Sequence, residues 1–171
     1  AVRRLVGAAL LCIGAAAPGF ALAARLGRRV TDLEAMRAGV LAIERGLRSG
    51  LLPLEELLRQ AARAAGGRGE VFFARCADGL AGLSGQSFSG LWEAELAASP
   101  LELEGGERGV LRRLGGVLGR YDAAGQSAAL SAAAQELSAC LEQARERQGR
   151  LGRVYRAVGV CAGVFLAILL W

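Results

Sequence analysis

The residues best placed for acid–base chemistry are two pairs of neighbouring carboxylates, Glu55 with Glu56 and Glu93 with Glu95. A pair of carboxylates can catalyse proton transfer when both side chains reach the same reacting group. Residues one or two positions apart on a helix, however, point in different directions. We therefore interpret these glutamates as parts of solvated helix faces.

Nucleophilic and metal chemistry is also poorly represented. The sequence contains no histidine, which is the commonest general base and metal ligand. Its four cysteines, Cys12, Cys76, Cys140 and Cys161, are not spaced as metal ligands, and two of them lie in apolar terminal segments. We interpret them as small buried hydrophobic residues, with a disulfide between Cys76 and Cys140 left open. No catalytic, cofactor-binding or metal-binding residue is predicted, and the chain is not expected to be an enzyme.

Motifs for phosphate and nucleic-acid recognition are missing as well. The glycine pairs at residues 105–106 and 115–116 do not follow a predicted strand, as the glycines of nucleotide-binding loops do. All 21 basic residues are arginine, which we interpret as a result of GC-rich codon usage. The net charge of +5 comes largely from arginines beside apolar ends, without a basic stripe with interleaved aromatic residues. We expect no nucleic acid, no small-molecule substrate and no cofactor.

The strongest feature of the sequence is a pair of uncharged segments near its two ends. Residues 5–24 form a run of 20 uncharged residues, which as a helix would span about 30 Å, the thickness of a hydrocarbon core. Residues 157–171 form a second run of 15 residues, which is short for a span unless a flanking arginine extends it. We predict transmembrane helices at residues 1–24 and 154–171.

Glycines could bring these two spans into close contact. Gly7 and Gly14 lie two turns apart on one face of the first run, and Gly159 and Gly163 form a GxxxG pair in the second. Small residues of this kind let membrane helices approach closely. We therefore predict that the four glycines pack the spans together.

The positions of the arginines predict the orientation of the spans, because cytoplasmic flanks of membrane helices are enriched in basic residues. Arg3 and Arg4 are the only arginines on the outer flank of the first run. The middle of the chain is therefore expected in the cytoplasm, with both termini outside. Six arginines are predicted to flank the membrane on the cytoplasmic side: Arg25, Arg28, Arg29, Arg150, Arg153 and Arg156.

A cleaved signal peptide is the alternative interpretation of the first run. Arg3 and Arg4 would be its basic region, and Ala21-Leu22-Ala23 would be its cleavage site. The arginines that follow the run argue against cleavage. Under this alternative the mature chain would be a secreted, soluble helical binding protein.

Between the two runs the apolar residues recur at helical spacing, and no segment alternates as a strand does. The stripe of the first helix is Leu33, Met36, Val40, Ile43 and Leu47. Capping and turn residues predict further helices from Pro53 to Gly66, at about 70–83, from Ser89 to Ser99, at about 103–118, and from Asp122 into the second run. The predicted fold is all-α: an antiparallel bundle of about six helices at residues 25–153, whose first and last helices extend into the two transmembrane spans.

Several segments, taken in order, resemble one known family. They are the apolar run ending in Gly19-Phe20, the segment GLLPLEEL at residues 50–57, Leu114-Gly115 and Leu118-Gly119 followed by Asp122 and Gln126, and GRVYR at residues 152–156 before a glycine-rich last segment. On these segments the chain resembles the stage III sporulation protein AB family of spore-forming Firmicutes. That family usually has lysines near the last span, where this chain has arginines.

The resemblance implies a function as well as a fold. It implies a cytoplasmic domain similar to the platform domain of type II secretion and type IV pilus machines. It also implies membership of the channel complex between mother cell and forespore, in the mother-cell membrane around the forespore, with a secretion-type ATPase as partner. We therefore expect a non-enzymatic membrane scaffold that binds this ATPase and other subunits of the complex.

Six residues of the resembling segments are candidate partner contacts: Pro53, Leu54, Gly115, Gly119, Asp122 and Gln126. Each also has a structural interpretation. A proline can start a helix, glycines permit close packing or a turn, Asp122 can cap a helix, and Gln126 lies on the same side one turn later. Both interpretations stay open at the level of the sequence.

Overall fold

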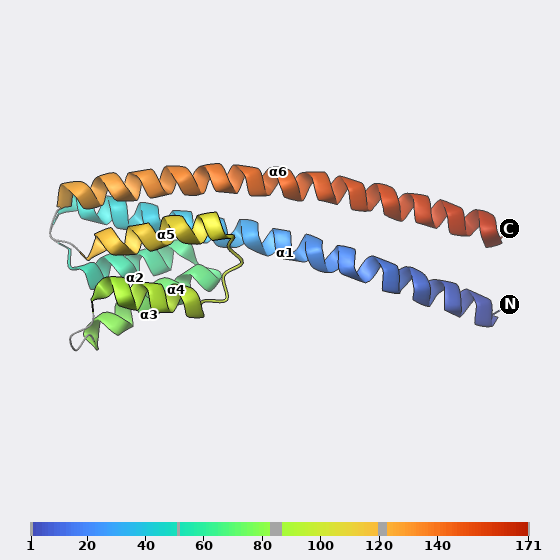
Figure 1. Cartoon of the computed structure of the whole chain (residues 1–171), viewed down its shortest axis with the longest axis horizontal. Helices are drawn as coiled ribbons and strands as arrows, with labels where there is room; N and C mark the ends of the chain where they lie inside the picture. Colours follow the sequence, from blue (N-terminus) through green and yellow to red (C-terminus); the bar gives the residue numbers. More distant parts are fainter. Residues whose placement is uncertain (1, 51, 83–86, 120–122, 171) are drawn as a thin grey trace. The chain divides into compact units, whose positions relative to one another are not determined.

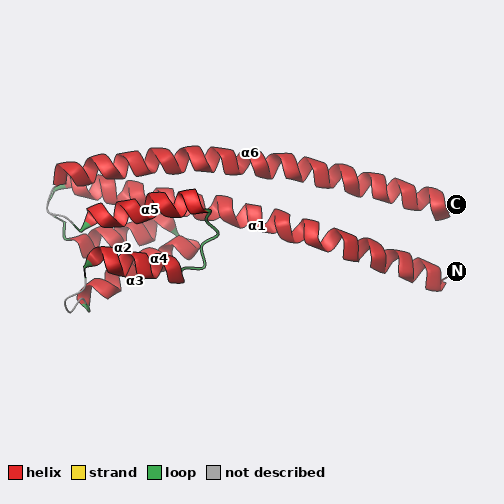
Figure 2. Cartoon of the chain, in the orientation of Figure 1, coloured by secondary structure: helices red, strands yellow, loops and turns green. Residues whose placement is uncertain are grey.

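Apolar residues at helical spacing form helices over most of the chain that the structure describes. The computed structural model describes the backbone of residues 2–50, 52–82, 87–119 and 123–170, and the side chains of residues 21–50, 52–82, 87–119, 125–154, 158 and 161. Within these ranges all elements are α-helices and none is a strand, as predicted (Figure 2). The helices are α1 (Val2–Ser49), α2 (Leu54–Ala65), α3 (Gly67–Ala81), α4 (Phe88–Ala98), α5 (Gly105–Leu118) and α6 (Ala123–Leu170).

The chain divides into two compact units. One is Arg29–Glu142, and the other consists of Ala1–Arg28 and Gln143–Trp171. The first unit is the helical bundle, and it is shorter at each end than the predicted domain at residues 25–153. In this bundle α2 and α3 pack against α1, α5 is joined to α6, and α4 lies against α3 and α5 (Figure 1).

The apolar stripe predicted for α1 forms the centre of this bundle. Leu33, Met36, Val40 and Ile43 are each fully buried, whereas Leu47 is half-buried near the end of the helix. On another side of α1, Arg37 Nε donates to Ser138 Oγ at 2.6 Å, which joins α1 to α6. The three- and four-residue spacing thus predicted the buried face of α1 correctly.

An aromatic cluster fills the space between α3, α4 and α5. The ring of Trp92 lies edge-on to that of Phe72, with centroids 4.9 Å apart, and it also contacts Phe73 and Phe88. Trp92 Nε1 donates to the carbonyl oxygen of Leu111 at 2.8 Å. This hydrogen bond satisfies the indole N–H in an otherwise apolar environment.

Glycine and proline set the ends of the first helices. Helix α1 ends at Ser49, because Gly50 adopts a positive φ of 83°. Helix α2 begins at Leu54, one residue after Pro53, which is the extended residue before the helix and not its first residue. Helix α3 begins at Gly67 and not near residue 70, because Gly66 O already accepts the first helical hydrogen bond from Glu70 N, at 2.9 Å.

Two predicted helix starts were displaced by local hydrogen bonds. The prediction that Ser89 caps the fourth helix was wrong: Ser87 does so, since its Oγ accepts a hydrogen bond from Gly90 N at 3.3 Å. Helix α5 starts at Gly105 and not near residue 103, because Leu101 is buried and Leu103 N donates to Leu101 O at 3.0 Å. The segment before α5 is therefore a folded connection.

The transmembrane spans stay a prediction. Among the residues that the structure describes, no helix combines the length and the apolarity that crossing a membrane requires. The side chains of most of the two apolar runs, which include Gly7, Gly14, Gly159 and Gly163, lie outside the described residues. The backbone of α1 does run without a break from Val2 to Ser49, as predicted, and that of α6 runs from Ala123 to Leu170.

Candidate functional site

The connection between α4 and α5, residues 99–104, is tied to several other elements by polar side chains. We call this connection the strap. Arg68 at the start of α3 donates from Nη1 to the carbonyl oxygen of Pro100 at 2.9 Å, and Asp32 Oδ2 on α1 accepts from the backbone N–H of Glu102 at 2.7 Å. Segments far apart in the sequence therefore meet at the strap.

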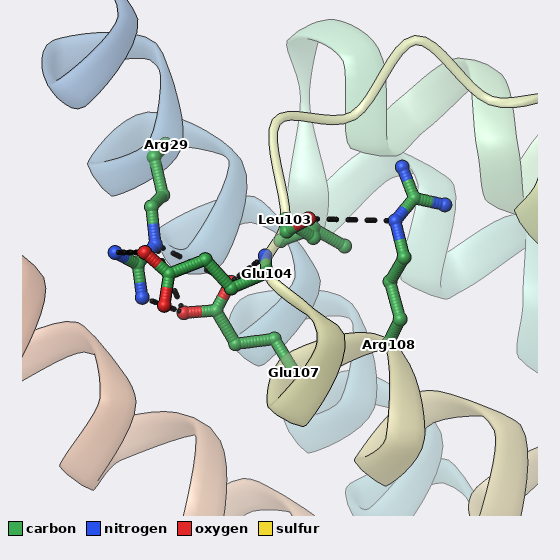
Figure 3. A network of polar contacts seen from close by, with 5 residues as sticks. All are labelled: Arg29, Leu103, Glu104, Glu107 and Arg108. Carbon is green, nitrogen blue, oxygen red and sulfur yellow. Dashed lines mark hydrogen bonds and ion pairs between the residues drawn. The ribbon is translucent and has the colours of Figure 1, made fainter.

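Arg29 holds the end of the strap through two carboxylates (Figure 3). Its Nε donates to Glu107 Oε1 at 3.0 Å, and its Nη1 pairs with Glu104. Glu107 Oε2 also accepts from the backbone N–H of Glu104 at 2.7 Å, which satisfies a free donor before α5. Arg29 is 8% exposed and Glu107 is 1% exposed, so both charges are withdrawn from water.

This burial shapes the acid–base properties of Arg29. Burial alone would lower the pKa of its guanidinium, but the hydrogen bond and charge of Glu107, followed by the charge of Glu104, outweigh that effect and raise it. A buried ion pair needs hydrogen bonds of this kind to offset the loss of hydration. Arg29 is therefore held in its charged form as part of the bundle.

Asp32 lies one turn after Arg29 on α1 and anchors the middle of the strap. Its Oδ1 accepts from Arg68 Nε at 3.0 Å, and its Oδ2 pairs with Arg68 Nη2 at 2.7 Å. Burial raises the pKa of this carboxyl, and the hydrogen bond from the Glu102 N–H and the charge of Arg68 oppose the increase only in part. Burial thus makes the ionised form of Asp32 less favourable than it would be in water.

Arg108 on α5 holds the strap by its carbonyl oxygens. Its guanidinium donates to Leu96 O and Leu101 O, each at 2.9 Å, and to Leu103 O at 3.4 Å (Figure 3 shows the last of these). These carbonyls lie at the end of α4 and in the strap, where no helix provides a partner. Arg108 therefore completes the hydrogen bonding of an irregular segment.

The charged side chains of this network hold helices together. Asp32, Glu104 and Glu107 each contact an arginine, so none of them is presented alone to a reacting group. Within the described ranges, no group of three or more acidic, cysteine or histidine side chains could hold a metal ion. Cys76 and Cys140 are free thiols, and burial together with the nearby Glu95 raises the pKa of Cys76 to about 12.

Of the predicted contact residues, Gly115 and Gly119 serve the packing of α5 on α4. A Cβ at Gly115 would lie 2.2 Å from Trp92 Cδ1, and one at Gly119 would lie 3.3 Å from Phe88 Cβ. Gln126 Nε2 donates to Leu118 O at 3.2 Å, which joins the start of α6 to the end of α5. Asp122 lies outside the described residues. The structural interpretation thus accounts for these glycines and this hydrogen bond.

Pro53 and Leu54 belong to the resembling segment at residues 50–57. Pro53 is exposed and precedes α2, and Leu54 is half-buried at its first position. Neither of them lines the shallow surface groove between α1 and α2, which has a volume of about 520 Å³. We call it the α1–α2 groove; it is lined by Ala42, Arg45, Gly46, Ser49, Gln60, Arg63 and Ala64.

The arginines predicted to flank a membrane divide into two groups. Arg25, Arg28, Arg150 and Arg153 are exposed, and the side chain of Arg156 is not among those described. Arg29 lies inside the network of Figure 3, a role that the sequence did not predict. The one sequence signal was the three-residue spacing of Arg29 and Asp32, which places both on neighbouring positions of one helix face.

Comparisons with known proteins give a consistent result. The family model described as stage III sporulation protein AB matches residues 4–171. A curated relative, stage III sporulation protein AB of Bacillus subtilis (strain 168), is 25% identical over 169 residues, which are 98% of each chain. A solved structure of a stage III sporulation protein AB covers 72% of this chain and 98% of its own, at 26% identity and a TM-score of 0.65.

Proposed function

The chain belongs to the stage III sporulation protein AB family, and from this membership we propose that it is a non-enzymatic scaffold of the channel complex between mother cell and forespore. It would be anchored in the mother-cell membrane around the forespore. Its bundle would lie in the cytoplasm and bind a secretion-type ATPase. Its role is mechanical: the bundle binds a partner while the terminal helices fix it in the membrane.

The family match over residues 4–171 is the observation that carries this proposal. It includes both terminal helices as well as the bundle, and the relative from Bacillus subtilis, named for sporulation, matches over the same extent. The two uncharged runs lie in those terminal helices. A sporulation protein with a bundle between two such runs is suited to hold a complex at a membrane.

The polar network supports a scaffold role. A scaffold must keep the positions of its surfaces fixed while a partner acts on them. Arg29, Asp32 and Arg68 join α1 to α5, α3 and the strap by hydrogen bonds that are buried or partly buried, so a displacement of α1 would have to break them. Such a bundle would transmit force between a partner and the helices that continue from it.

Crosslinking in membranes tests the assembly role. The full chain, with an affinity tag, would be crosslinked in sporulating cells, and a tagged two-span membrane protein of unrelated function would be the control. We expect the ATPase and other membrane subunits to be recovered with the chain and not with the control. Recovery of the uncrosslinked chain alone would contradict the proposal.

A protease site inserted after Gly50 tests the orientation. Gly50 is exposed in the turn between α1 and α2, so an insertion there leaves the buried stripe intact. The proposal expects cleavage in inverted vesicles and protection in intact cells. Cleavage from outside intact cells, or a mature chain that begins near Ala24, would favour the secreted alternative.

A further inference from the structure

We propose that the α1–α2 groove binds an acidic segment of the ATPase, an inference that rests on the proposed scaffold function for the identity of this partner. The groove lies on the surface of the bundle between α1 and α2.

The groove has a floor of small residues. Ala42 and Gly46 on α1 and Ala64 on α2 line it, so a bound segment could approach both helices closely. A Cβ at Gly46 would lie 2.4 Å from Leu57 Cδ2, which shows that the two helices are already in tight contact there. The groove is therefore a shallow depression on two closely packed helices.

The charge of the groove is positive. Arg45 and Arg63 line it together with Ser49 and Gln60, and no carboxylate is among the lining residues. Arg63 pairs with Glu56 at 2.9 Å, whereas the one hydrogen bond described for the Arg45 guanidinium is to Leu41 O, at 3.2 Å. Other arginines of the bundle differ from Arg45 in this respect: Arg29, Arg68 and Arg113 each pair with a carboxylate.

This charge determines the chemistry of the occupant. Arginine prefers carboxylates, to which it can donate two parallel hydrogen bonds. Leu52, which is 36% exposed, lies 3.8 Å from the position of a Cβ at Gly46 and adds an apolar contact at the edge of the groove. The occupant is thus an acidic segment that also presents an apolar side chain, and its binding should weaken as salt screens the charges.

Charge reversal tests the groove. The full chain in detergent would carry Arg45→Glu and Arg63→Glu together, and the purified secretion-type ATPase of the same organism would be the probe. We expect the double variant to lose at least about ten-fold in affinity, because like charges would then face each other. Arg112→Glu is the matched control: Arg112 is exposed on α5, and its reversal should change the affinity by less than about two-fold.

A second pair of measurements keeps the proposal falsifiable if reversal disturbs folding. The neutral double variant, with Arg45→Gln and Arg63→Gln together, should retain the helicity and melting temperature of the wild type and still bind more weakly. A photo-crosslinking residue at Ala64, inside the groove, should capture the ATPase in sporulating cells, whereas one at the exposed Ala132 on α6 should not.

The outcomes separate this inference from the function on which it rests. Wild-type affinity in both double variants, or capture from Ala132 but not from Ala64, would overturn the groove and leave the scaffold function standing. If the wild-type chain neither binds the ATPase nor crosslinks to other membrane subunits, both proposals are wrong.

Discussion

The polar network depends most on one residue, Arg29. It contacts Glu104 and Glu107 at the start of α5, from a position on α1 that is 78 residues away in sequence from Glu107. Removing one partner of a buried ion pair leaves the other charge without compensation, and this costs more than the pair contributes. The consequence can be measured one residue at a time.

Substitution of Glu107 should destabilise the bundle strongly. We expect Glu107→Ala to lower the free energy of unfolding by about 3 kcal/mol, since it leaves the buried Arg29 with Glu104 as its remaining carboxylate and removes the acceptor for Glu104 N. Denaturant unfolding of the full chain in detergent measures this. Glu136→Ala is the control: its pair with Arg113 is exposed and screened by solvent, so it should cost less than about 1 kcal/mol.

Asp32 should give the bundle an unusual response to acid. Because the folded-state pKa of Asp32 is raised above its ordinary value of 3.8, the folded state binds this proton more tightly than the unfolded state does. The ionised carboxylate therefore lowers stability above the folded pKa, and this penalty disappears as pH falls through the raised pKa toward 3.8.

Comparison with Asp32→Asn isolates this effect from the other acidic groups. Residue 32 does not titrate in the variant. The stability of the wild type relative to the variant should therefore increase as pH is lowered from 7 toward 4, as measured by unfolding at several pH values. A constant difference, or a decrease toward acid pH, would contradict the raised pKa.

At the scale of the elements, glycines decide how closely helices approach. Neighbouring positions of α5 differ sharply: Gly115 lies against the ring of Trp92, whereas a Cβ at Gly116 would meet no atom within 4 Å. The first glycine is required by packing. The second only weakens the helix, because glycine is the more flexible residue in the unfolded chain.

Two alanine substitutions distinguish these roles. Gly115→Ala should destabilise the bundle by about 1–3 kcal/mol, because the indole ring would have to move. Gly116→Ala should stabilise it by about 0.5–1 kcal/mol through the better helix propensity of alanine. Thermal unfolding of both variants in parallel measures the difference, and equal effects would refute the close contact with Trp92.

Apolar spacing and helix-ending residues predicted most helices, but they did not predict the polar network. The stripe of α1 and the ends of its neighbours followed from apolar spacing, Gly50 and Pro53. The start of α5 and the cap of α4 did not, because Leu101 is buried by tertiary packing and the hydroxyl of Ser87, two residues before Ser89, accepts the capping hydrogen bond from Gly90. The contacts of Arg29 with Glu107 and of Asp32 with Glu102 join residues 70 or more positions apart, a distance at which periodicity gives no information.

For the whole molecule, the terminal segments should decide where the protein is found. A fragment of residues 29–142 contains the entire compact bundle and lacks both uncharged runs. We expect it to fold as a helical domain and to remain in the supernatant after centrifugation, whereas the full chain should sediment with membranes and require detergent. Circular dichroism and fractionation measure both. A full chain that stays in the supernatant would contradict membrane anchoring.

The separation of Arg29 from Glu107 also affects how the protein is synthesised. A ribosome releases the chain from its N-terminus, so Arg29 emerges 78 residues before its buried partner. Until then the apolar stripe of α1 lacks α5 and α6 as neighbours, and contacts so distant in sequence are slow to form. A translational pause before the codon of Glu104 would prolong this open state and expose the nascent chain to aggregation. A pause after the codons of α5 would instead let Arg29 pair with Glu104 and Glu107 before α6 is synthesised.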